Sequence, residues 1–186
     1  MGVSQSLLRI AFMATAIDYF NTLEGNLCLR VNRLSRNPWV QQFFSAISKL
    51  GDGWFWGATG ILTILVHGID VMPKVLTVGA TAIAGVAIYK GLKQNLVRER
   101  PYINHRGIHC GTAPLDRYSF PSGHTLHAVC FTVMFNAIEP LFLAVTLPFA
   151  ILVAASRIIL GLHYPSDVVV GAAIGGLLGS GATLLL

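Results

Sequence analysis

The stretch VVVGAAIGGLLGSGATLLL, Val168–Leu186, contains no charged residue. Its length is close to the roughly 20 residues that a helix needs to cross a bilayer. A segment in lipid must satisfy its own backbone hydrogen bonds, so this stretch is predicted to be helical. Glycines at positions 171, 175, 176, 179 and 181 would let another helix approach closely. The stretch therefore predicts a membrane protein built from packed helices.

Four more apolar stretches precede it, separated by charged or turn-forming residues: Trp54–Ile69, Val75–Tyr89, Thr125–Ile138 and Leu141–Ala155. Glu139-Pro140 between the last two stretches is predicted to form a tight turn. We expect an all-α, integral membrane helical bundle with about five to six transmembrane helices.

The composition agrees with a membrane protein of one domain. Hydrophobic residues make up 54% of the 186 residues and charged residues only 11%, and the mean hydropathy is +0.64. Soluble domains carry about 25% charged residues. The alternative, a soluble protein with an unusually buried core, would lack the charge needed to cover its surface.

Residues 1–50 have a different pattern from the rest of the chain. Leu7–Ile17 is apolar except for Arg9 but short for a span, and charged residues then alternate with leucines until Asn37-Pro38 interrupts the pattern. This spacing favours an amphipathic helix in the membrane interface. The alternative is a further span over Leu7–Leu29. A cleaved signal peptide is not expected, because no basic residue precedes Leu7. We thus divide a single domain, 1–186, into an interfacial segment, 1–50, and a helical bundle, 51–186.

Basic residues concentrate in two regions, Arg30–Arg36 and Lys90–Arg117, and the net charge is +5. Beside apolar spans this distribution indicates anionic head groups or phosphate as partners, and no nucleic acid. Cys28, Cys110 and Cys130 are scattered and predict no disulfide framework.

Three polar clusters stand out against the apolar background: Lys93–Pro101, Pro121–His124 and Ser156–Asp167. The first ends one span and the second opens the next. Two spans then return the chain to the same side for the third. Span counting therefore predicts that the three clusters meet at one membrane face, beneath the long loop between them.

The chemistry of these clusters suits a phosphate group. Lys93, Arg100 and Arg157 are three converging cations that would repel one another. An anion with about two negative charges would compensate them. Ser122 and Gly123 precede an apolar helix, whose N-terminus offers backbone amides to an anion.

Two histidines could perform a phosphoryl transfer. Asp167 follows His163 by four residues and could orient the ring, which leaves the other nitrogen free to attack phosphorus. His124 lies on another element and could protonate the leaving oxygen from the opposite side. Taken singly, each of these residues could instead be an interface anchor or a helix cap. We expect catalysis because they all fall on one face.

Other polar residues carry weaker hypotheses. His105, His109 and Cys110 lack a fourth partner at metal-ligand spacing, so neither a metal site nor a cofactor is expected. His127 is interpreted as a polar neighbour of His124. Asp116 and Arg117 could form a substrate rim or a surface pair, and the sequence leaves both interpretations open.

Together the clusters resemble the three-part signature of the type-2 phosphatidate phosphatase superfamily, KxxxxxxRP, PSGH and SRxxxxxHxxxD. Here it reads KQNLVRERP (Lys93–Pro101), PSGH (Pro121–His124) and SRIILGLHYPSD (Ser156–Asp167). The resemblance implies a metal-independent phosphatase with His163 as nucleophile, Asp167 as its orienting group and His124 as acid and then base. It assigns phosphate binding to the remaining motif residues, Lys93, Arg100, Ser122, Gly123 and Arg157.

We therefore expect a lipid phosphate phosphatase that acts on a phosphomonoester or diphosphate, such as phosphatidylglycerophosphate, phosphatidate or undecaprenyl diphosphate. A lipid phosphotransferase would use the same residues, and a non-enzymatic binder or transporter of anionic lipid is the third hypothesis. The resemblance implies a bacterial inner-membrane protein with its site on the periplasmic side. The positive-inside rule would place the basic face in the cytoplasm, but phosphate binding explains several of those charges.

Overall fold

A computed structural model describes residues 19–186 of the chain, and every regular element in that range is helical. A helix over residues 19–32 is followed by the main helices α2 (Pro38–Lys49), α3 (Phe55–His67), α4 (Met72–Asn95), α6 (Gly123–Ile138), α7 (Leu143–Ile159) and α8 (Pro165–Thr183). Short helical turns connect them: η1 (Arg33–Arg36), η2 (Leu50–Trp54), η3 (Ile69–Val71), α5 (Pro101–Asn104) and η4 (Pro140–Phe142). The predicted all-α fold class is confirmed.

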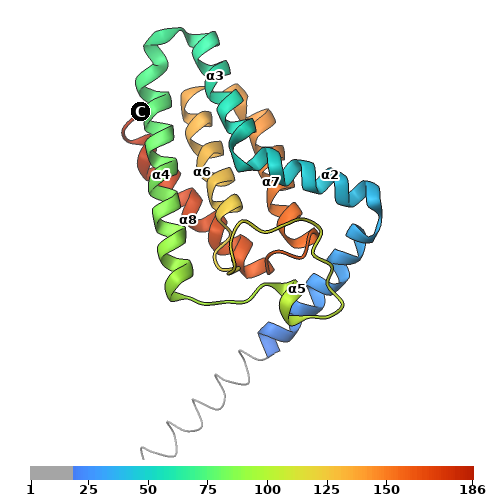
Figure 1. Ribbon diagram of the computed structural model, residues 1–186. Helices are drawn as coiled ribbons and strands as arrows, with labels where there is room; N and C mark the ends of the chain where they lie inside the picture. Colours follow the sequence, from blue (N-terminus) through green and yellow to red (C-terminus); the bar gives the residue numbers. More distant parts are fainter. Residues whose placement is uncertain (1–18) are drawn as a thin grey trace, which may run out of the picture.

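Each of the five apolar stretches becomes a helix, in the order α3, α4, α6, α7 and α8 (Figure 1). Three helical segments of residues 19–186 are long and apolar enough to cross a membrane: Ile69–Asn95, Pro140–Ile159 and Pro165–Leu185. α3 and α6 are shorter, with 13 and 16 residues. The predicted turn is also present, and Glu139 accepts a hydrogen bond from the Leu141 amide at 3.2 Å.

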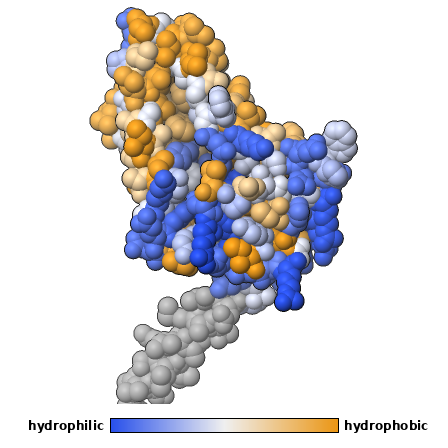
Figure 2. Space-filling view, in the orientation of Figure 1, coloured by the Kyte–Doolittle hydropathy of each residue, from blue (hydrophilic) through white to orange (hydrophobic). Residues whose placement is uncertain are grey.

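The bundle is apolar on its outside, as a helix bundle in lipid requires. Large aliphatic side chains such as Leu65, Ile83 and Leu177 are each more than 70% exposed. In Figure 2 the apolar surface covers the end where α3 joins α4, while hydrophilic residues gather over the opposite end, where the long loop lies. The helices therefore offer an apolar surface to lipid and a polar end to water.

α6 is the central helix and packs against α4, α7 and α8. Its contact with α8 depends on glycines at every fourth position. A Cβ at Gly171 would lie 2.5 Å from the Ser122 carbonyl oxygen, and one at Gly175 would lie 2.1 Å from that of Leu126. No side chain fits at those distances, so the glycines let the two backbones meet. This contact fixes the start of α6 beside the start of α8.

An aromatic cluster joins α3 to α6 and α7. Phe55 stacks on Phe149 with ring centroids 3.7 Å apart, and Trp56 lies 5.1 Å from Phe131. Such pairs add to the free energy gained from apolar burial. Because η2 leads directly into α3, the cluster also holds η2 near the first turns of α6.

The helix over residues 19–32 turns its polar stripe inward and its leucines outward. Glu24, Cys28 and Asn32 are buried, whereas Leu23 and Leu27 are nearly half exposed. The amphipathic pattern is therefore present, with the protein covering its polar side. The predicted break at Asn37-Pro38 is also present, where the Asn37 side chain accepts a hydrogen bond from the Trp39 amide. The choice between an interfacial helix and a span over Leu7–Leu29 depends largely on residues 1–18, outside the described range.

Candidate active site

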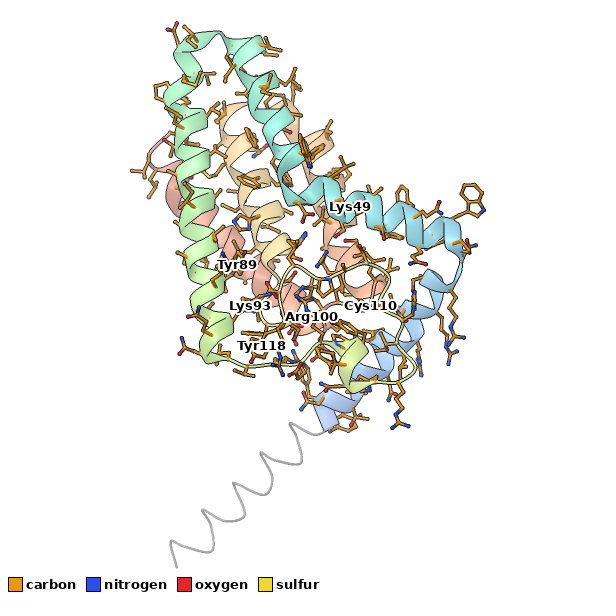
Figure 3. The ribbon with its side chains drawn as sticks, in the orientation of Figure 1. Lys49, Tyr89, Lys93, Arg100, Cys110 and Tyr118 are labelled. Carbon is orange, nitrogen blue, oxygen red and sulfur yellow. The ribbon has the colours of Figure 1, made fainter. Side chains whose placement is uncertain are left out.

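The segment between α4 and α6 folds over one end of the bundle and includes α5 (Figure 1). Lys93 at the end of α4, together with Arg100 and Tyr118 of this segment, lies at that end of the molecule (Figure 3). The turn between α7 and α8 reaches the same end, because Arg100 donates to the Leu162 carbonyl at 2.8 Å. The three polar clusters therefore lie together.

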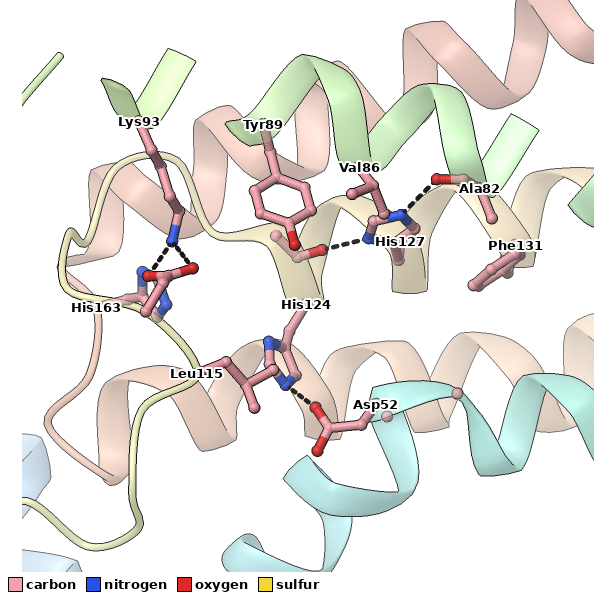
Figure 4. A pocket seen from close by; sticks show the side chains of 14 residues that line it. Asp52, Ala82, Val86, Tyr89, Lys93, Leu115, His124, His127, Phe131 and His163 are labelled. Carbon is pink, nitrogen blue, oxygen red and sulfur yellow. Dashed lines mark hydrogen bonds and ion pairs between the residues drawn. The ribbon is translucent and has the colours of Figure 1, made fainter. Parts of the chain in front are cut away.

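A cavity of about 320 Å³ opens between α4, η2 and the start of α6. Lys93, Gly123, His124 and His163 line it. In Figure 4 Lys93 and His163 lie at one end of the cavity, and Ala82 and Phe131 lie at the other. The cavity thus joins a charged end to an apolar end.

His163 is buried in the turn between α7 and α8. Its Nε2 lies 3.2 Å from Nη1 of Arg100. A guanidinium can only donate, so Nε2 accepts and the proton of the neutral ring belongs on Nδ1. Burial lowers the pKa of the His163 imidazole well below its usual range, and the charges of the surrounding cations lower it further. The neutral ring therefore directs a lone pair toward the cation cluster at pH 7.

Asp167 lies beside the other nitrogen of this ring. Its Oδ2 is 3.6 Å from His163 Nδ1 and accepts a hydrogen bond from the Tyr164 amide at 2.8 Å. The distance to the ring exceeds a hydrogen bond, although catalytic contacts are often long in unliganded enzymes. Asp167 therefore caps α8 and also faces His163.

His124 lies in the first turn of α6, where its Nε2 contacts Oδ1 of Asp52 (Figure 4). Asp52 belongs to η2 and precedes Gly53, whose φ of 141° favours glycine. Sequence reasoning missed this carboxylate, because Asp52 lies outside the three polar clusters. Its signal was an acid between two glycines directly before an apolar stretch.

Lys93 and Arg100 share one carboxylate, that of Asp116. Lys93 Nζ donates to both Asp116 oxygens at 2.7 and 2.8 Å and to the Tyr118 carbonyl at 2.9 Å. Arg100 Nη2 donates to Oδ1 of the same carboxylate at 2.7 Å. Burial raises the pKa of Asp116, but its hydrogen bond with Lys93 and the two positive charges outweigh burial and lower the pKa.

Asp116 and Arg117 do not form a surface pair with each other, because they have different partners. Asp116 faces the site and lines the cavity. Arg117 lies at the surface and pairs with Glu99 at 3.0 Å.

Arg157 is the cation of the cluster whose charge is least compensated. Its Nη1 donates to the Ser48 hydroxyl of α2, and its buried Nε has no hydrogen-bond partner within residues 19–186. No carboxylate of that range forms an ion pair with it. Buried polar groups are nearly always paired, so an unpaired guanidinium nitrogen here suits an anionic ligand.

The two small residues before His124 differ in what they face. Gly123 lines the cavity at the start of α6, whose first amides have no helical partners. Ser122 is fully buried; its amide donates to the Asp167 carbonyl at 3.0 Å, and its hydroxyl pairs with Thr125. In this structure Ser122 joins α6 to α8 and is not among the residues that line the cavity.

Two further residues were missed at the sequence level: Arg98 holds Asp167, and Glu24 holds Arg98. Arg98 Nη1 donates to Asp167 Oδ1 at 2.6 Å, and its Nη2 donates to Glu24 at 2.7 Å. The Arg98 guanidinium also lies 4.1 Å from the ring centroid of Tyr164. Glu24 in turn accepts from the Ser166 amide at 2.7 Å. The N-terminal helix thus contributes directly to the support of the site.

The considered metal ligands His105, His109 and Cys110 form no common site. Among residues 19–186, no three or more His, Cys, Asp or Glu side chains lie close enough together to hold a metal ion.

The comparison with protein families supports the assignment that the motifs suggested. The PAP2 superfamily model matches residues 74–186, which contain all three clusters. The chain belongs to the PAP2 superfamily. Glu24, Ser48 and Asp52, which contact site residues, precede the matched PAP2 region.

Curated PAP2 relatives are lipid phosphatases of bacteria. Decaprenylphosphoryl-5-phosphoribose phosphatase of Mycobacterium tuberculosis is 36% identical over 127 residues, which cover 65% of this chain and 68% of the relative. Phosphatidylglycerophosphatase B of Bacillus subtilis is 28% identical over 179 residues, which cover 78% of this chain and 74% of the relative.

Solved structures show the same PAP2 fold. Aquifex aeolicus LpxE superposes with a TM-score of 0.72 at 28% identity, covering 84% of this chain and 92% of that chain. The PAP2 type phosphatidylglycerolphosphate phosphatase of Bacillus subtilis gives 0.70 at 23% identity, covering 96% and 92%, and this likeness concerns the fold alone. The protein is therefore an integral membrane protein with the fold of the PAP2 membrane phosphatases.

Proposed function

We propose that the protein hydrolyses the terminal phosphate of a membrane lipid phosphomonoester or diphosphate through a phosphohistidine at His163. The observation that carries this proposal is the cavity itself. One end is lined by His163 and Lys93, with Arg100 behind them at His163 Nε2; His124 also lines the cavity, and the other end is apolar. A phosphate with a lipid chain matches both ends.

In the first step His163 Nε2 attacks phosphorus, and the hydrogen bond from Arg100 passes from Nε2 to a phosphate oxygen. The bond from phosphorus to the lipid oxygen breaks as the bond to Nε2 forms. His124 donates a proton to the departing oxygen, while Asp52 holds its ring. Asp167 stabilises the Nδ1 proton as positive charge develops on His163.

In the second step His124 takes a proton from water, whose oxygen attacks phosphorus. The bond to Nε2 breaks, inorganic phosphate leaves and His163 returns to its neutral form. Lys93, Arg100 and Arg157, with the amides at Gly123, stabilise the equatorial oxygens in both steps. We propose that Ser122 positions the start of α6 and does not bind phosphate, because its hydroxyl pairs with that of Thr125.

The test is phosphate release by the purified protein from a panel of lipid phosphates, with and without EDTA. We expect release from at least one phosphomonoester, no loss with EDTA and inhibition by vanadate, because side-chain cations replace a metal in this mechanism. A strict need for a divalent ion would contradict the mechanism, and no release from any lipid would contradict the function. Labelled phosphate recovered in an acceptor lipid instead of water would indicate phosphotransfer.

We further propose that the site faces the periplasmic side of a bacterial inner membrane. In its support, three basic residues of the loop region are compensated by carboxylates, Lys93 and Arg100 by Asp116 and Arg98 by Asp167 and Glu24. Because the proposed site itself accounts for these three residues, their presence on this face does not indicate a cytoplasmic location. A water-soluble phosphomonoester should be hydrolysed by right-side-out vesicles, and hydrolysis only by inverted vesicles would overturn this orientation.

We propose that the chain acts as one phosphatase domain, to which the N-terminal segment belongs. Ser48 contacts Arg157, and Glu24 contacts Arg98, so residues before the helical bundle hold groups of the site.

Arg98→Gln should lower kcat by about ten- to a hundredfold, the usual effect of losing an orienting partner. Arg98 holds Asp167 but does not line the cavity, so KM should change little. The measurement is the split between kcat and KM in folded protein, with Arg98→Lys as a partial rescue. Arg117→Gln is the matched control, because Arg117 is an exposed arginine nearby in the chain. A rise in KM at unchanged kcat would contradict the positioning role.

A further inference from the structure

The Asp116 carboxylate occupies the position between two cations that a substrate phosphate should take. Lys93 and Arg100 both donate to Asp116 Oδ1, each at 2.7 Å, and the dashed lines at Lys93 in Figure 4 mark its two bonds to this carboxylate. These are the short, charge-assisted bonds typical of phosphate recognition. Asp116 therefore resembles part of a bound phosphate in the unliganded site.

Of the three paired side chains, that of Asp116 can move out of the site most easily. Its side chain is 38% exposed, whereas those of Lys93 and Arg100 are 8% and 2% exposed. It lies in the segment between α5 and α6, which has no regular helix at this position. The carboxylate can reach water by a movement of that segment, while the two cations stay in place.

We propose that Asp116 is a specificity residue that reserves the phosphate site for groups with two negative charges, the terminal phosphates of phosphomonoesters and diphosphates. Monoanionic phosphodiesters, the form of bulk membrane phospholipids, do not displace it. This inference rests on the proposed function, because it concerns which lipid phosphates enter the same site.

The physical argument compares charges. A phosphodiester brings one negative charge, as Asp116 does, so replacing the carboxylate gains little and costs the movement of the segment. A phosphomonoester carries about −1.5 to −2 charges at pH 7 and three acceptor oxygens. Its oxygens can accept from both Lys93 and Arg100, which now share Asp116. Asp116 therefore sets a displacement cost that the contacts of a dianion exceed and those of a monoanion do not.

Such discrimination matters for an enzyme in a membrane. Phosphodiester lipids surround the protein, and an open site with three cations would bind their head groups. The negative charge of Asp116 competes with each of these head groups for Lys93 and Arg100. Only a ligand with a second negative charge gains enough free energy to displace it. Without Asp116, the cations would be accessible to every phosphate group of the bilayer.

The test compares Asp116→Asn with wild type and with Glu99→Gln, which removes a carboxylate between α4 and α5 that pairs with Arg117. Thermal shifts at pH 8 give apparent affinities for inorganic phosphate, a dianion, and dimethyl phosphate, a monoanionic diester. We expect wild type and Glu99→Gln to bind phosphate and to bind dimethyl phosphate only weakly. Because Asp116 no longer has to be displaced, the apparent affinity of Asp116→Asn for dimethyl phosphate should rise by at least about tenfold, the change that a charge-assisted hydrogen bond supports.

An unchanged affinity of Asp116→Asn for dimethyl phosphate would overturn the proposal, as would the absence of any shift with phosphate in wild type. If Asp116→Asn unfolds without ligand, its stabilisation by phosphate should exceed that of wild type, and an equal or smaller gain also counts against the proposal. Asp116→Glu keeps the charge and should keep the weak binding of the diester. This readout needs no turnover: wild type that binds phosphate selectively but releases none from lipids would contradict the proposed function alone.

Discussion

His163→Ala should lower the rate of phosphate release by about a thousandfold or more, the scale of loss when a nucleophile is removed. The reason is geometric. Nε2 of His163 directs its lone pair toward the cations, and Asp167 lies beside its other nitrogen. Without this ring no covalent intermediate can form, and water would have to attack phosphorus without its help.

The measurement is single-turnover phosphate release from a lipid phosphomonoester, in protein whose folding is checked by its melting temperature. His109→Ala is the matched control, because His109 is an exposed histidine at the same polar end of the molecule and does not line the cavity. The variant His163→Ala should still bind vanadate through the three cations. Substantial turnover by folded His163→Ala would refute the nucleophile assignment.

The helices could be predicted from sequence because lipid leaves few choices. A long apolar stretch must bond its own backbone, so each of the five stretches became a helix. The glycines of Val168–Leu186 also predicted a close contact, which occurs between α8 and α6 at Gly171 and Gly175. Spacing alone was enough for these features, since they depend on neighbours along one helix.

The partners of the charged residues could not be predicted in the same way. Asp52, Glu24 and Arg98 reach the site through contacts between segments far apart in the sequence, and no periodicity reports such contacts. Asp116 lies in a loop without a repeating pattern, so the sequence predicted three mutually repelling cations, whereas in the structure two of them share a carboxylate.

The N-terminal helix illustrates a limit of amphipathic patterns. The alternation of charged residues with Leu23 and Leu27 predicted a two-sided helix correctly, but a period does not say what covers each side. Glu24 is buried because Arg98 and Ser166 satisfy its carboxylate. A membrane-surface helix would have placed that same stripe in water.

His124→Ala should lose far more rate with an alkyl lipid phosphate than with nitrophenyl phosphate. General acid catalysis contributes about 10²- to 10⁴-fold and matters most when the leaving oxygen is strongly basic. His124 lies on a different element from His163 and lines the same cavity, with Asp52 holding its Nε2. It is therefore placed to protonate an alkoxide, whereas nitrophenolate needs little protonation.

The comparison uses each variant as its own control, since the ratio of the two rates cancels differences in expression and folding. The rate of His163→Ala should fall equally with both substrates, because attack on phosphorus is required for either one. An equal loss on both substrates in His124→Ala would show that His124 binds or supports the site instead of donating the proton. His127 would then be a poor substitute, because carbonyl oxygens of Gly123 and Ala82 already lie 2.9 and 3.0 Å from its two ring nitrogens. That result would require the leaving oxygen to take its proton from water or from Lys93.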